Sequence, residues 1–281
     1  MINKILVAVA GRGLCEQMFN MLIEIPYFQA ASVTVLHVVP PQVSSEGMSA
    51  KLEEGGKILA EAVDSLKVDP KKVNPRLKQG DPKDIVCQVA DEEESELIIM
   101  GSRGLGKLQA ILENSVSQYV FQLTSHPMLL VKDDVYVKKI RRVMVALDSS
   151  EEGKNSLNMG ISFVNQIPGA ELILSHLKKD ISGKSSQDYT ADAEKDPVIV
   201  EALKEAKRKG IQKYRCVSGS GKPGPEICKI SQELNVDLLI VGSPDRRPSS
   251  AKSLIDLDRL LGDSASDYVR VYANCPVLLV R

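Results

Sequence analysis

The residues best placed to bind a ligand lie in the stretch "IIMGSRGLGKLQAILENSVSQYV". Its apolar start ends at Gly101, where glycine permits a positive φ and lets a ligand approach the backbone closely. Gly104 and Gly106 extend this bare main chain. Ser115 and Ser117 then come at the predicted start of a helix, where free N–H groups and the helix dipole favour an anion. These residue types in this order predict a cradle for phosphate.

Two cationic side chains lie near the predicted cradle. The alternative interpretation, a glycine-rich turn that binds no phosphate, stays open. Arg103 and Lys107 lie in the loop and could neutralise an anion, although such side chains often only face solvent. Glycines turn chains more often than they bind phosphate, and the Walker pattern is absent. In "GSGKPG", Lys222 precedes Pro223 rather than serine or threonine, so Gly219–Gly224 is predicted to be a turn before a helix.

The elements that must position the cradle occur twice in the chain. "KILVAVA" from Lys4 returns as "RVMVALD" from Arg142, "ELIIMGS" returns as "DLLIVGS", and "HPMLLVK" returns as "CPVLLVR". The order of the segments is kept while their spacing grows in small steps, which indicates duplication of a whole domain with loop insertions. We predict two domains, residues 1–136 and 137–281, with the boundary near the charged segment "DDVYVKK".

Each half predicts five strands alternating with four helices. Short, continuous apolar runs rich in β-branched residues are typical of strands buried on both faces of a parallel sheet. The predicted fold class is therefore α/β, with two tandem doubly wound five-stranded parallel sheets of Rossmann-like type. In the first half the strands are predicted at Ile5–Val9, Val33–Val38, Val73–Gln79, Leu97–Met100 and Met128–Val131.

Helices and loops are also predicted from pattern. Lys51–Leu66 has apolar residues at helical spacing, and Asp81 is a cap before a helix at Ile85–Ala90. The polar stretches Pro40–Ala50 and Ile181–Pro197 are predicted to be loops. The acidic run "EEE" after residue 91 is predicted to be a solvated helix end, or a turn entering the fourth strand.

Composition excludes several classes of function. The chain has 281 residues with 43% hydrophobic content and a net charge of −1, which gives no electrostatic case for nucleic acid or acidic lipid. No apolar run approaches the length of about 18 residues that a membrane span needs. The start "MINKILVAVAGRG" does not resemble a signal peptide, so we expect a cytoplasmic location. The five scattered cysteines predict free thiols, and the three histidines are predicted to be core residues.

The glycine loop after "LIIMGS", the following "SVSQYV" and the last strand "HPMLLV" together resemble the universal stress protein family. The resemblance covers both halves almost end to end, as a tandem two-domain form. It implies five parallel strands per domain and a pseudo-dimer within one chain, paired through the last strands "MLLV" and "VLLV". It also implies a cytoplasmic stress-response regulator that binds an adenine nucleotide (ATP, ADP or AMP), with or without magnesium.

In the first half most of the family's nucleotide site is kept. The loop keeps Gly101 and Gly104, and Asn114 stands where the motif has a third glycine, a mild change because asparagine tolerates left-handed φ. His37–Val38 matches the step that faces adenine in the family. The first-strand aspartate is replaced by Ala10, followed by "GRG", which puts any contact through that carboxylate in doubt. The predicted site residues are Ala10, Val38, Met100, Gly101, Arg103, Gly104, Gly106, Lys107, Asn114, Ser115, Val116 and Ser117.

The second half departs in the opposite way. Asp148 is present where the family has its aspartate, but Asp245 replaces the second glycine and adds a negative charge. Between Gly242 and Ser264 lie 21 residues, against 13 between Gly101 and Ser115, an insertion of eight. Cations in the insertion could rebuild an anion site, or the insertion is a plain solvated loop; they are Arg246, Arg247 and Lys252. The predicted degenerate site consists of Asp148, Leu177, Gly242, Asp245, Ser264 and Ser266.

These departures predict that the first half binds the nucleotide and that the second half binds it weakly or not at all. No base or nucleophile stands beside the predicted cradle, so we expect no catalytic residue, no resident metal and at most weak ATP hydrolysis. Two classes of function stay open: a regulator that signals by nucleotide occupancy, and a ligand-independent scaffold with degenerate sites. Expected partners are a second copy of the chain and a regulatory protein, with neither nucleic acid nor membrane insertion.

Overall fold

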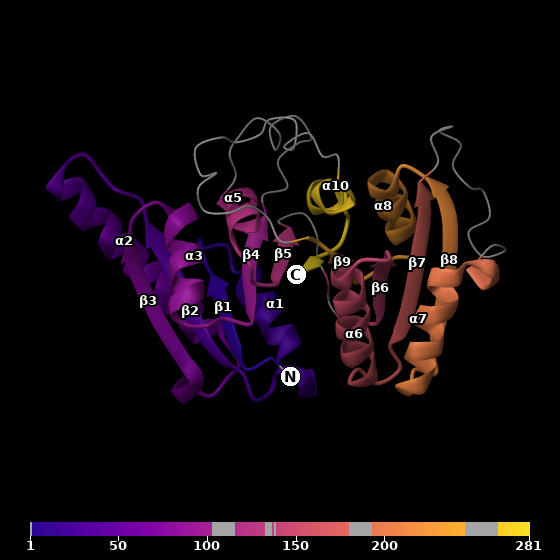
Figure 1. Ribbon diagram of the computed structural model, residues 1–281. Helices are drawn as coiled ribbons and strands as arrows, with labels where there is room; N and C mark the ends of the chain where they lie inside the picture. The colour runs from indigo at the N-terminus through magenta and orange to yellow at the C-terminus, as the bar shows by residue number, and fades with distance from the viewer. Residues whose placement is uncertain (1, 103–115, 133–136, 138, 180–192, 245–263) are drawn as a thin grey trace. The chain divides into compact units, whose positions relative to one another are not determined.

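The computed structural model describes residues 2–102, 116–132, 137, 139–179, 193–244 and 264–281 (Figure 1). They form two compact units, the first ending with residue 132 and the second beginning with residue 137. Across these ranges, none of the helices is both long and apolar enough to cross a lipid bilayer. Each unit is an α/β domain, as predicted; the precise boundary and the pairing of the last strands stay predictions.

The first unit is built on a parallel sheet with the strand order β3-β2-β1-β4-β5. The chain moves outward from β1 to β3 and then returns to the other side of β1 for β4 and β5. All five predicted strands are confirmed, with shifts of at most two residues at their ends. They are β1 (Lys4–Ala8), β2 (Ser32–Val39), β3 (Val73–Gln79), β4 (Leu97–Ser102) and β5 (Met128–Lys132).

Helices cover both faces of this sheet. Because the chain reverses its direction along the sheet after β3, right-handed crossovers put α1 and α2 on one face and α3 and α5 on the other. The contact between α3 and α5 agrees with this arrangement (Figure 1). The helices are α1 (Leu14–Leu22), α2 (Ser45–Ser65), α3 (Pro82–Glu92) and α5 (Val116–Leu123), with 3-10 turns at Pro26–Phe28 and Pro70–Lys72.

Helix α2 begins earlier than its apolar pattern predicts. The hydroxyl of Ser44 accepts the N–H of Gly47 at 3.0 Å and caps the helix, and Glu46 lies in the first turn. The prediction of a loop over Pro40–Ala50 is therefore wrong from Ser45 onward. The first two turns are polar and exposed, so only their cap, not their periodicity, could have revealed them. By contrast, the predicted cap of α3 is confirmed by a 3.0 Å hydrogen bond.

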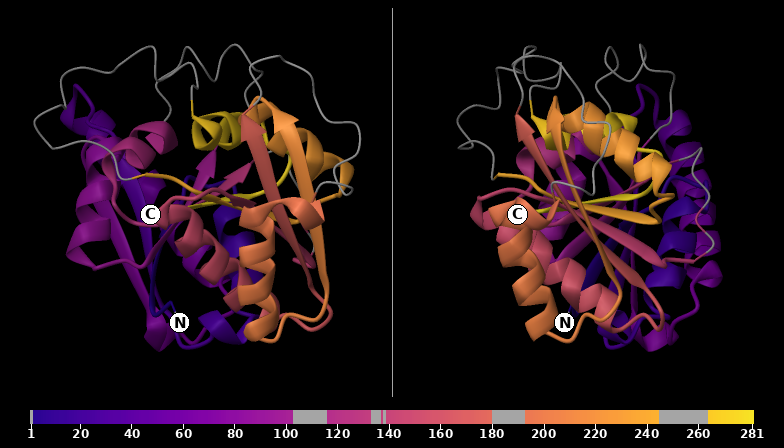
Figure 2. Two further views of the ribbon diagram at one scale, coloured as in Figure 1. Left: turned by 45° about the vertical axis from the view of Figure 1, so that its right-hand side comes forward. Right: turned by 90° about the vertical axis from the view of Figure 1, so that its right-hand side faces the viewer.

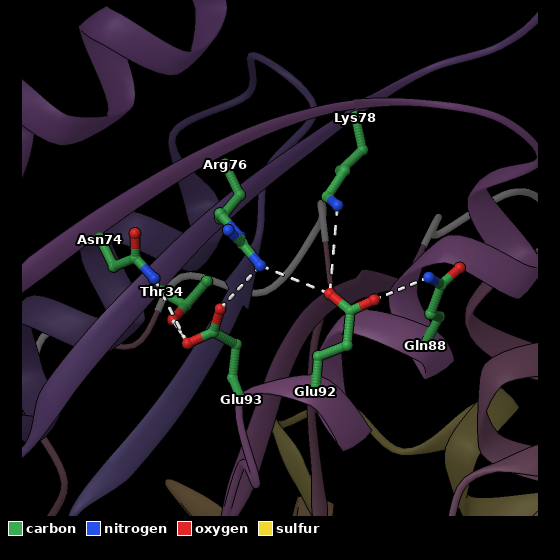
Figure 3. Close-up of polar contacts among 7 residues, drawn as sticks. All are labelled: Thr34, Asn74, Arg76, Lys78, Gln88, Glu92 and Glu93. Carbon is green, nitrogen blue, oxygen red and sulfur yellow. Dashed lines mark hydrogen bonds and ion pairs between the residues drawn. The ribbon is translucent and has the colours of Figure 1, made fainter.

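The edge strand β3 is joined to the end of α3 by charged side chains (Figure 3). Arg76 lies 3.0 Å from Glu93 and 3.4 Å from Glu92, and Lys78 lies 4.0 Å from Glu92. Thr34, Asn74 and Gln88 complete the network. As predicted, the acidic run ends α3 at Glu92 and turns toward β4, with Glu92 and Glu94 exposed. Its side chains are also paired: two of the glutamates bind β3, and the third, Glu94, pairs with Lys4 at 2.6 Å.

The second unit repeats the same architecture, with the strand order β10-β9-β6-β7-β8 and parallel pairs throughout. Helices again lie on both sides of the strands (Figure 2). Its strands are β6 (Arg142–Leu147), β7 (Glu171–Lys179), β8 (Tyr214–Gly221), β9 (Leu238–Gly242) and β10 (Val277–Val280). Its helices are α6 (Glu151–Asn165), α7 (Pro197–Arg208), α8 (Pro223–Glu233) and α10 (Ala265–Tyr272), with a 3-10 turn at Ala193–Lys195.

Two predictions for this unit need correction. The predicted turn Gly219–Gly224 is shorter than expected, since β8 runs to Gly221 and α8 begins at Pro223. The predicted loop Ile181–Pro197 contains a 3-10 turn near its end and the first residue of α7; residues 181–192 lie outside the described residues. The central strands carry the core of each unit: Leu6 and Val7 in the first, and Val143 and Met144 in the second, are fully buried.

Candidate functional site

The first-half site is organised by the place where the strand order reverses, between β1 and β4. In an open α/β sheet, ligands bind beyond the carboxyl ends of the strands at this point. Ala8 pairs in register with Met100. The exposed Ala10, just after β1, and Gly101 in β4 therefore lie at the same edge of the sheet. Met100 itself is buried at 8% exposure and contributes to the floor rather than the surface of the edge.

The turn from β1 into α1 depends on two glycines. Gly11 and Gly13 have φ of 74° and 71°, a left-handed conformation that glycine adopts without steric cost. Within α1, the thiol of Cys15 hydrogen-bonds the backbone of Gly101, and a Cβ added to that glycine would lie 3.8 Å from the sulfur. Burial, with the nearby charge of Glu16, raises the pKa of Cys15 to about 12. This thiol is thus a neutral packing group under the edge.

Sequence reasoning missed a buried acid at this edge, Glu16, which is only 4% exposed. Burial raises the pKa of its carboxyl, while the backbone N–H groups of Glu16 and Cys15 donate to it and oppose the rise. The carboxyl thus lies against the backbone of the first turn of α1, where the N-cap residue Gly13 has no side chain. The resemblance expects an aspartate at the position of Ala10. This chain has its carboxyl group in the first turn of the helix that follows Ala10. The sequence signal that could have identified Glu16 is its position three residues after the N-cap.

The predicted adenine-side step is held between a carbonyl and a helix. The Nδ1 atom of His37 lies 2.9 Å from the carbonyl oxygen of Val9, which fixes the ring beside the end of β1. On the other side, α2 packs closely through Gly55, since a Cβ there would lie 2.9 Å from the ring and 2.7 Å from Val39. The half-buried Val38 follows His37 at the same edge as Ala10.

The phosphate side of the site is described only in part. Val116 and Ser117 form the first turn of α5, and Ser117 is 3% exposed. Sequence reasoning did not single out Lys132, the last residue of β5, which is 5% exposed and pairs in register with Ser102 next to the glycine loop. Six predicted site residues lie outside the described residues: Arg103, Gly104, Gly106, Lys107, Asn114 and Ser115.

In the second half, the aspartate after β6 organises the start of α6. The side chain of Asp148 accepts the N–H of Ser150 at 2.9 Å and also hydrogen-bonds its hydroxyl. Ser150 in turn caps α6 by accepting the N–H of Gly153 at 3.0 Å. A Cβ on Gly153 would collide with the Asp148 carboxylate, and a Cβ on Gly242 would lie 2.7 Å from the helix backbone. Leu177 lies half-buried at the same edge in β7.

The start of α10 carries a closed network of hydroxyl groups. The hydroxyl of Ser264 accepts the N–H of Asp267 at 3.1 Å and donates to its carboxylate at 2.7 Å. Ser266 lies 3.1 Å from Ser264 and accepts from Ser243 at 3.3 Å. Arg281 donates to the hydroxyl of Ser243 at 3.3 Å. Residues named in the sequence prediction that lie outside the described residues are Asp245, Arg246, Arg247 and Lys252.

The histidines do not occupy the core as predicted, because each is half-buried and hydrogen-bonded. His126 lies 2.8 Å from Asp91. His176, at the position in β7 that His37 has in β2, bonds through Nδ1 to the Asp196 carboxylate at 2.8 Å instead of a strand carbonyl. Asp196 is fully buried, accepts the hydroxyl of Ser218 at 2.9 Å and caps α7. His37 therefore bonds the backbone after β1, and His176 bonds the side chain that caps α7.

The family follows from the match of the whole chain. The model of the universal stress protein family matches residues 1–132 and 139–281. The chain belongs to the universal stress protein family. The universal stress protein YxiE of Bacillus subtilis is 28% identical over 148 residues, which cover 47% of this chain and 100% of YxiE. A universal stress protein of Thermus aquaticus is 37% identical over 87 residues, which cover 31% of this chain and 62% of that protein.

A solved structure shows that the two-repeat form of this fold exists elsewhere in the family. The crystal structure of a universal stress protein from Archaeoglobus fulgidus matches with a TM-score of 0.74 at 20% sequence identity. The match covers 99% of this chain and 96% of that chain. The prediction of a tandem universal stress protein is therefore confirmed, in both family and fold.

Proposed function

We propose that this universal stress protein binds an adenine nucleotide (ATP, ADP or AMP), with or without magnesium, in its first half. Occupancy of the site, rather than fast catalysis, would then regulate a stress response. The observation that carries the proposal is the edge between β1 and β4, where Ala10, Val38 and Gly101 meet at the point of strand reversal.

The described part of the phosphate side supports an anionic ligand. Ser117 lies in the first turn of α5, where backbone N–H groups and the helix dipole favour negative charge. The backbone of Lys132, at the end of β5, lies beside Ser102 at the same edge. A nucleotide would place its phosphates toward these groups and its base toward the step at Val38.

We propose that the first half binds the nucleotide and that none of its described residues acts as a dedicated catalytic base. The acid found beside its edge, Glu16, already accepts hydrogen bonds from two backbone N–H groups and is buried. A general base must instead reach the proton that it removes. Any hydrolysis of ATP would therefore be slow and would not be the main activity.

Isothermal titration of the full chain with ATP, ADP and AMP tests the proposal. We expect one saturable site per chain, removed by Gly104→Asp because the carboxylate would lie where the phosphates bind. Asp148→Ala is the matched control in the second half and should leave the site unchanged. No heat of binding at millimolar nucleotide would refute nucleotide binding altogether.

Mass spectrometry of the protein purified without added nucleotide separates the regulator from a scaffold. A copurifying adenylate that is lost in Gly104→Asp supports a regulator. If the wild-type chain carries none and also binds none in titration, a ligand-independent scaffold accounts better for the partly degenerate sites. Unchanged copurification in Gly104→Asp would place the ligand elsewhere.

A further inference from the structure

Helix α2 consists of a part that packs on the sheet and a part that lies beyond it. The buried residues of the helix are Gly55, Leu59 and Ala62, all at or after its midpoint. None of the residues 45–54 is buried, although the helix runs without a break from its cap at Ser44. In Figure 1 the start of α2 projects away from the strands of the first unit. We call residues 45–54 the arm.

The apolar stripe of α2 continues into the arm. Met48 and Leu52 precede Gly55 by seven and three residues, so they lie on the helix face that Gly55 turns toward the sheet. Gly55 packs on Val39, the last residue of β2. Because α2 runs back along the strands, the arm lies past the carboxyl end of β2, and both side chains are only half-buried. The stripe is therefore left without strands beneath it in the arm.

Two adjacent glycines mark the base of the arm, and packing requires only one of them. A Cβ on Gly55 would lie 2.7 Å from Val39 and 2.9 Å from the ring of His37, so this position must stay bare. A Cβ on Gly56 would meet nothing within 4 Å. Glycine weakens a helix interior relative to alanine, because it loses more backbone freedom on folding. Gly56 therefore makes α2 easier to bend at the base of the arm without adding any contact.

The base of the arm lies beside the candidate site of the first half. Ile58 packs against Gly11 in the turn that follows β1: a Cβ added to that glycine would lie 3.4 Å from its side chain. Gly55 packs on His37, the residue before Val38. A movement about the glycine pair would thus carry the apolar stripe of the arm over the carboxyl ends of β1 and β2, where the candidate site lies.

The equivalent helix of the second unit, α7 (Pro197–Arg208), is described over its whole length and has no such arm. It has 12 residues against 21 in α2, and its buried residues begin with Ile199, the third of the helix. It contains no glycine. Its N-cap Asp196 hydrogen-bonds His176, the counterpart of His37, which fixes the start of α7 to β7. An arm with a weak base therefore belongs to the half that is proposed to bind the nucleotide.

We propose that the arm is a hinged lid, which closes over the base of an adenine nucleotide bound in the first half. Bending at Gly55 and Gly56 places Met48 and Leu52 on the ring, where a thioether and an aliphatic group pack well against an aromatic face. This inference rests on the proposed function. It goes beyond it by naming the segment whose position reports occupancy of the site, because the ligand binds the closed state more tightly.

Hydrogen exchange of the full chain, followed by mass spectrometry, tests the lid. With ATP at about ten times its dissociation constant, exchange at the amides of residues 49–54 should slow about tenfold, because opening then requires release of the ligand. Every adenine nucleotide that binds should slow it, since all carry the base, whereas inorganic triphosphate should not. Slowing by triphosphate, or unchanged exchange in the arm while ATP binds, would overturn the proposal.

Substitutions in the arm test the same lid through affinity. Leu52→Ser should weaken ATP binding about tenfold, because the apolar cover is lost. Ala50→Ser, on the exposed side of the arm, is the matched control and should leave binding unchanged. Gly56→Ala stiffens the hinge and should weaken ATP binding about fivefold, the factor that corresponds to the helix-forming advantage of alanine over glycine. If either Leu52→Ser or Gly56→Ala binds ATP as tightly as the wild type, the lid is refuted.

The proposed function and the lid can fail separately. If the wild-type chain binds no nucleotide in titration, the proposed function fails, and the hinge is tested in the chain without ligand. Gly56→Ala should then slow exchange at residues 57–59, whose helical hydrogen bonds cross the glycine pair, by about fivefold. Unchanged exchange at these residues would refute the hinge. If the wild type binds ATP without protection of the arm, the proposed function stands and the lid is wrong.

Discussion

Removal of the buried carboxylate of Asp196 should destabilise the second unit more than any exposed substitution. This side chain is fully buried and accepts hydrogen bonds from His176, from Ser218 and from the backbone N–H of Val198 at 3.0 Å. It thereby ties the start of α7 to the ends of β7 and β8. The perturbations to compare are Asp196→Ala, which removes every acceptor, and Asp196→Asn, which keeps one.

The expected magnitude follows from the groups that lose a partner. Loss of the helix cap costs about 1 kcal/mol. A buried hydroxyl left without a partner, here that of Ser218, costs about 1–3 kcal/mol, and the ring of His176 adds a similar amount. The sum for Asp196→Ala is about 3–7 kcal/mol, and its lower part coincides with the range of about 3–5 kcal/mol for breaking a buried pair. Asp196→Asn should cost less, about 1–3 kcal/mol, because its oxygen can still accept one hydrogen bond.

Urea denaturation measures these losses. With a slope of about 2 kcal/mol per molar urea, a loss of 3 kcal/mol lowers the midpoint of the second unit by about 1.5 M. Glu201→Gln, an exposed acid in α7, is the matched control and should change stability by no more than about 0.5 kcal/mol. A loss below about 1 kcal/mol for Asp196→Ala would show that the carboxylate does not hold these elements together.

The pH dependence provides an independent check. Burial alone would raise the pKa of Asp196, but hydrogen bonds from His176 and Ser218 outweigh it, and the pKa lies below its ordinary value of 3.8. A depressed pKa in the folded state stabilises the fold above the unfolded pKa, and this contribution is lost as the pH falls through the folded value. Wild type should therefore lose stability below about pH 4, and Asp196→Asn should lose less over that range.

Three further predictions concern the first unit. Gly55→Ala should destabilise this unit by about 1–3 kcal/mol, because the added methyl group meets β2 and β3 closely. In the neighbouring Gly56→Ala the methyl group meets nothing within 4 Å, so this control should stabilise the same helix by about 0.5–1 kcal/mol. Equal effects of the two substitutions in thermal melts would contradict the close packing at Gly55. With its pKa at about 12, Cys15 should resist iodoacetamide in the folded protein, while the three half-buried cysteines react first. Peptide mapping measures the order of labelling. Early labelling of Cys15 would argue against its burial. Ala10→Asp should destabilise the wild type and be tolerated with Glu16→Gly, with a coupling of about 0.5–3 kcal/mol in a double-mutant cycle. In the second half Gly153, three residues after the N-cap of α6 as Glu16 is in α1, leaves its space to the Asp148 carboxylate. Additive effects would refute that coupling.

The fold could be predicted from the sequence because its signals are local and repeated. Continuous apolar runs such as Leu97–Met100 leave few alternatives to a buried parallel strand. The duplication then let each half serve as a check on the other. The start of α2 could not be predicted in the same way, because its first turns face solvent and carry no apolar stripe. Its boundary depends on one side-chain hydrogen bond, that of Ser44.

The placement of candidate-site residues at the sheet edge could be predicted where it depends on backbone. Glycines at the strand ends and serines at helix starts mark an edge by their type alone. The role of Asp196 depends on burial and on partners distant in the chain, His176 and Ser218, which spacing does not encode. The two equivalent histidines show the limit clearly. His37 bonds a strand carbonyl and His176 bonds a carboxylate, although both stand at the same position in their repeats.

The edge strand β3 also affects how this protein can associate. An exposed strand edge is a template on which another chain can add a strand. Here Pro75 removes one backbone N–H from the middle of β3, and Arg76 and Lys78 place charges along it that are already paired with α3 (Figure 3). A strand added here would lack the hydrogen bond that Pro75 cannot donate and would lie beside charged side chains. These features disfavour growth of the sheet at this edge.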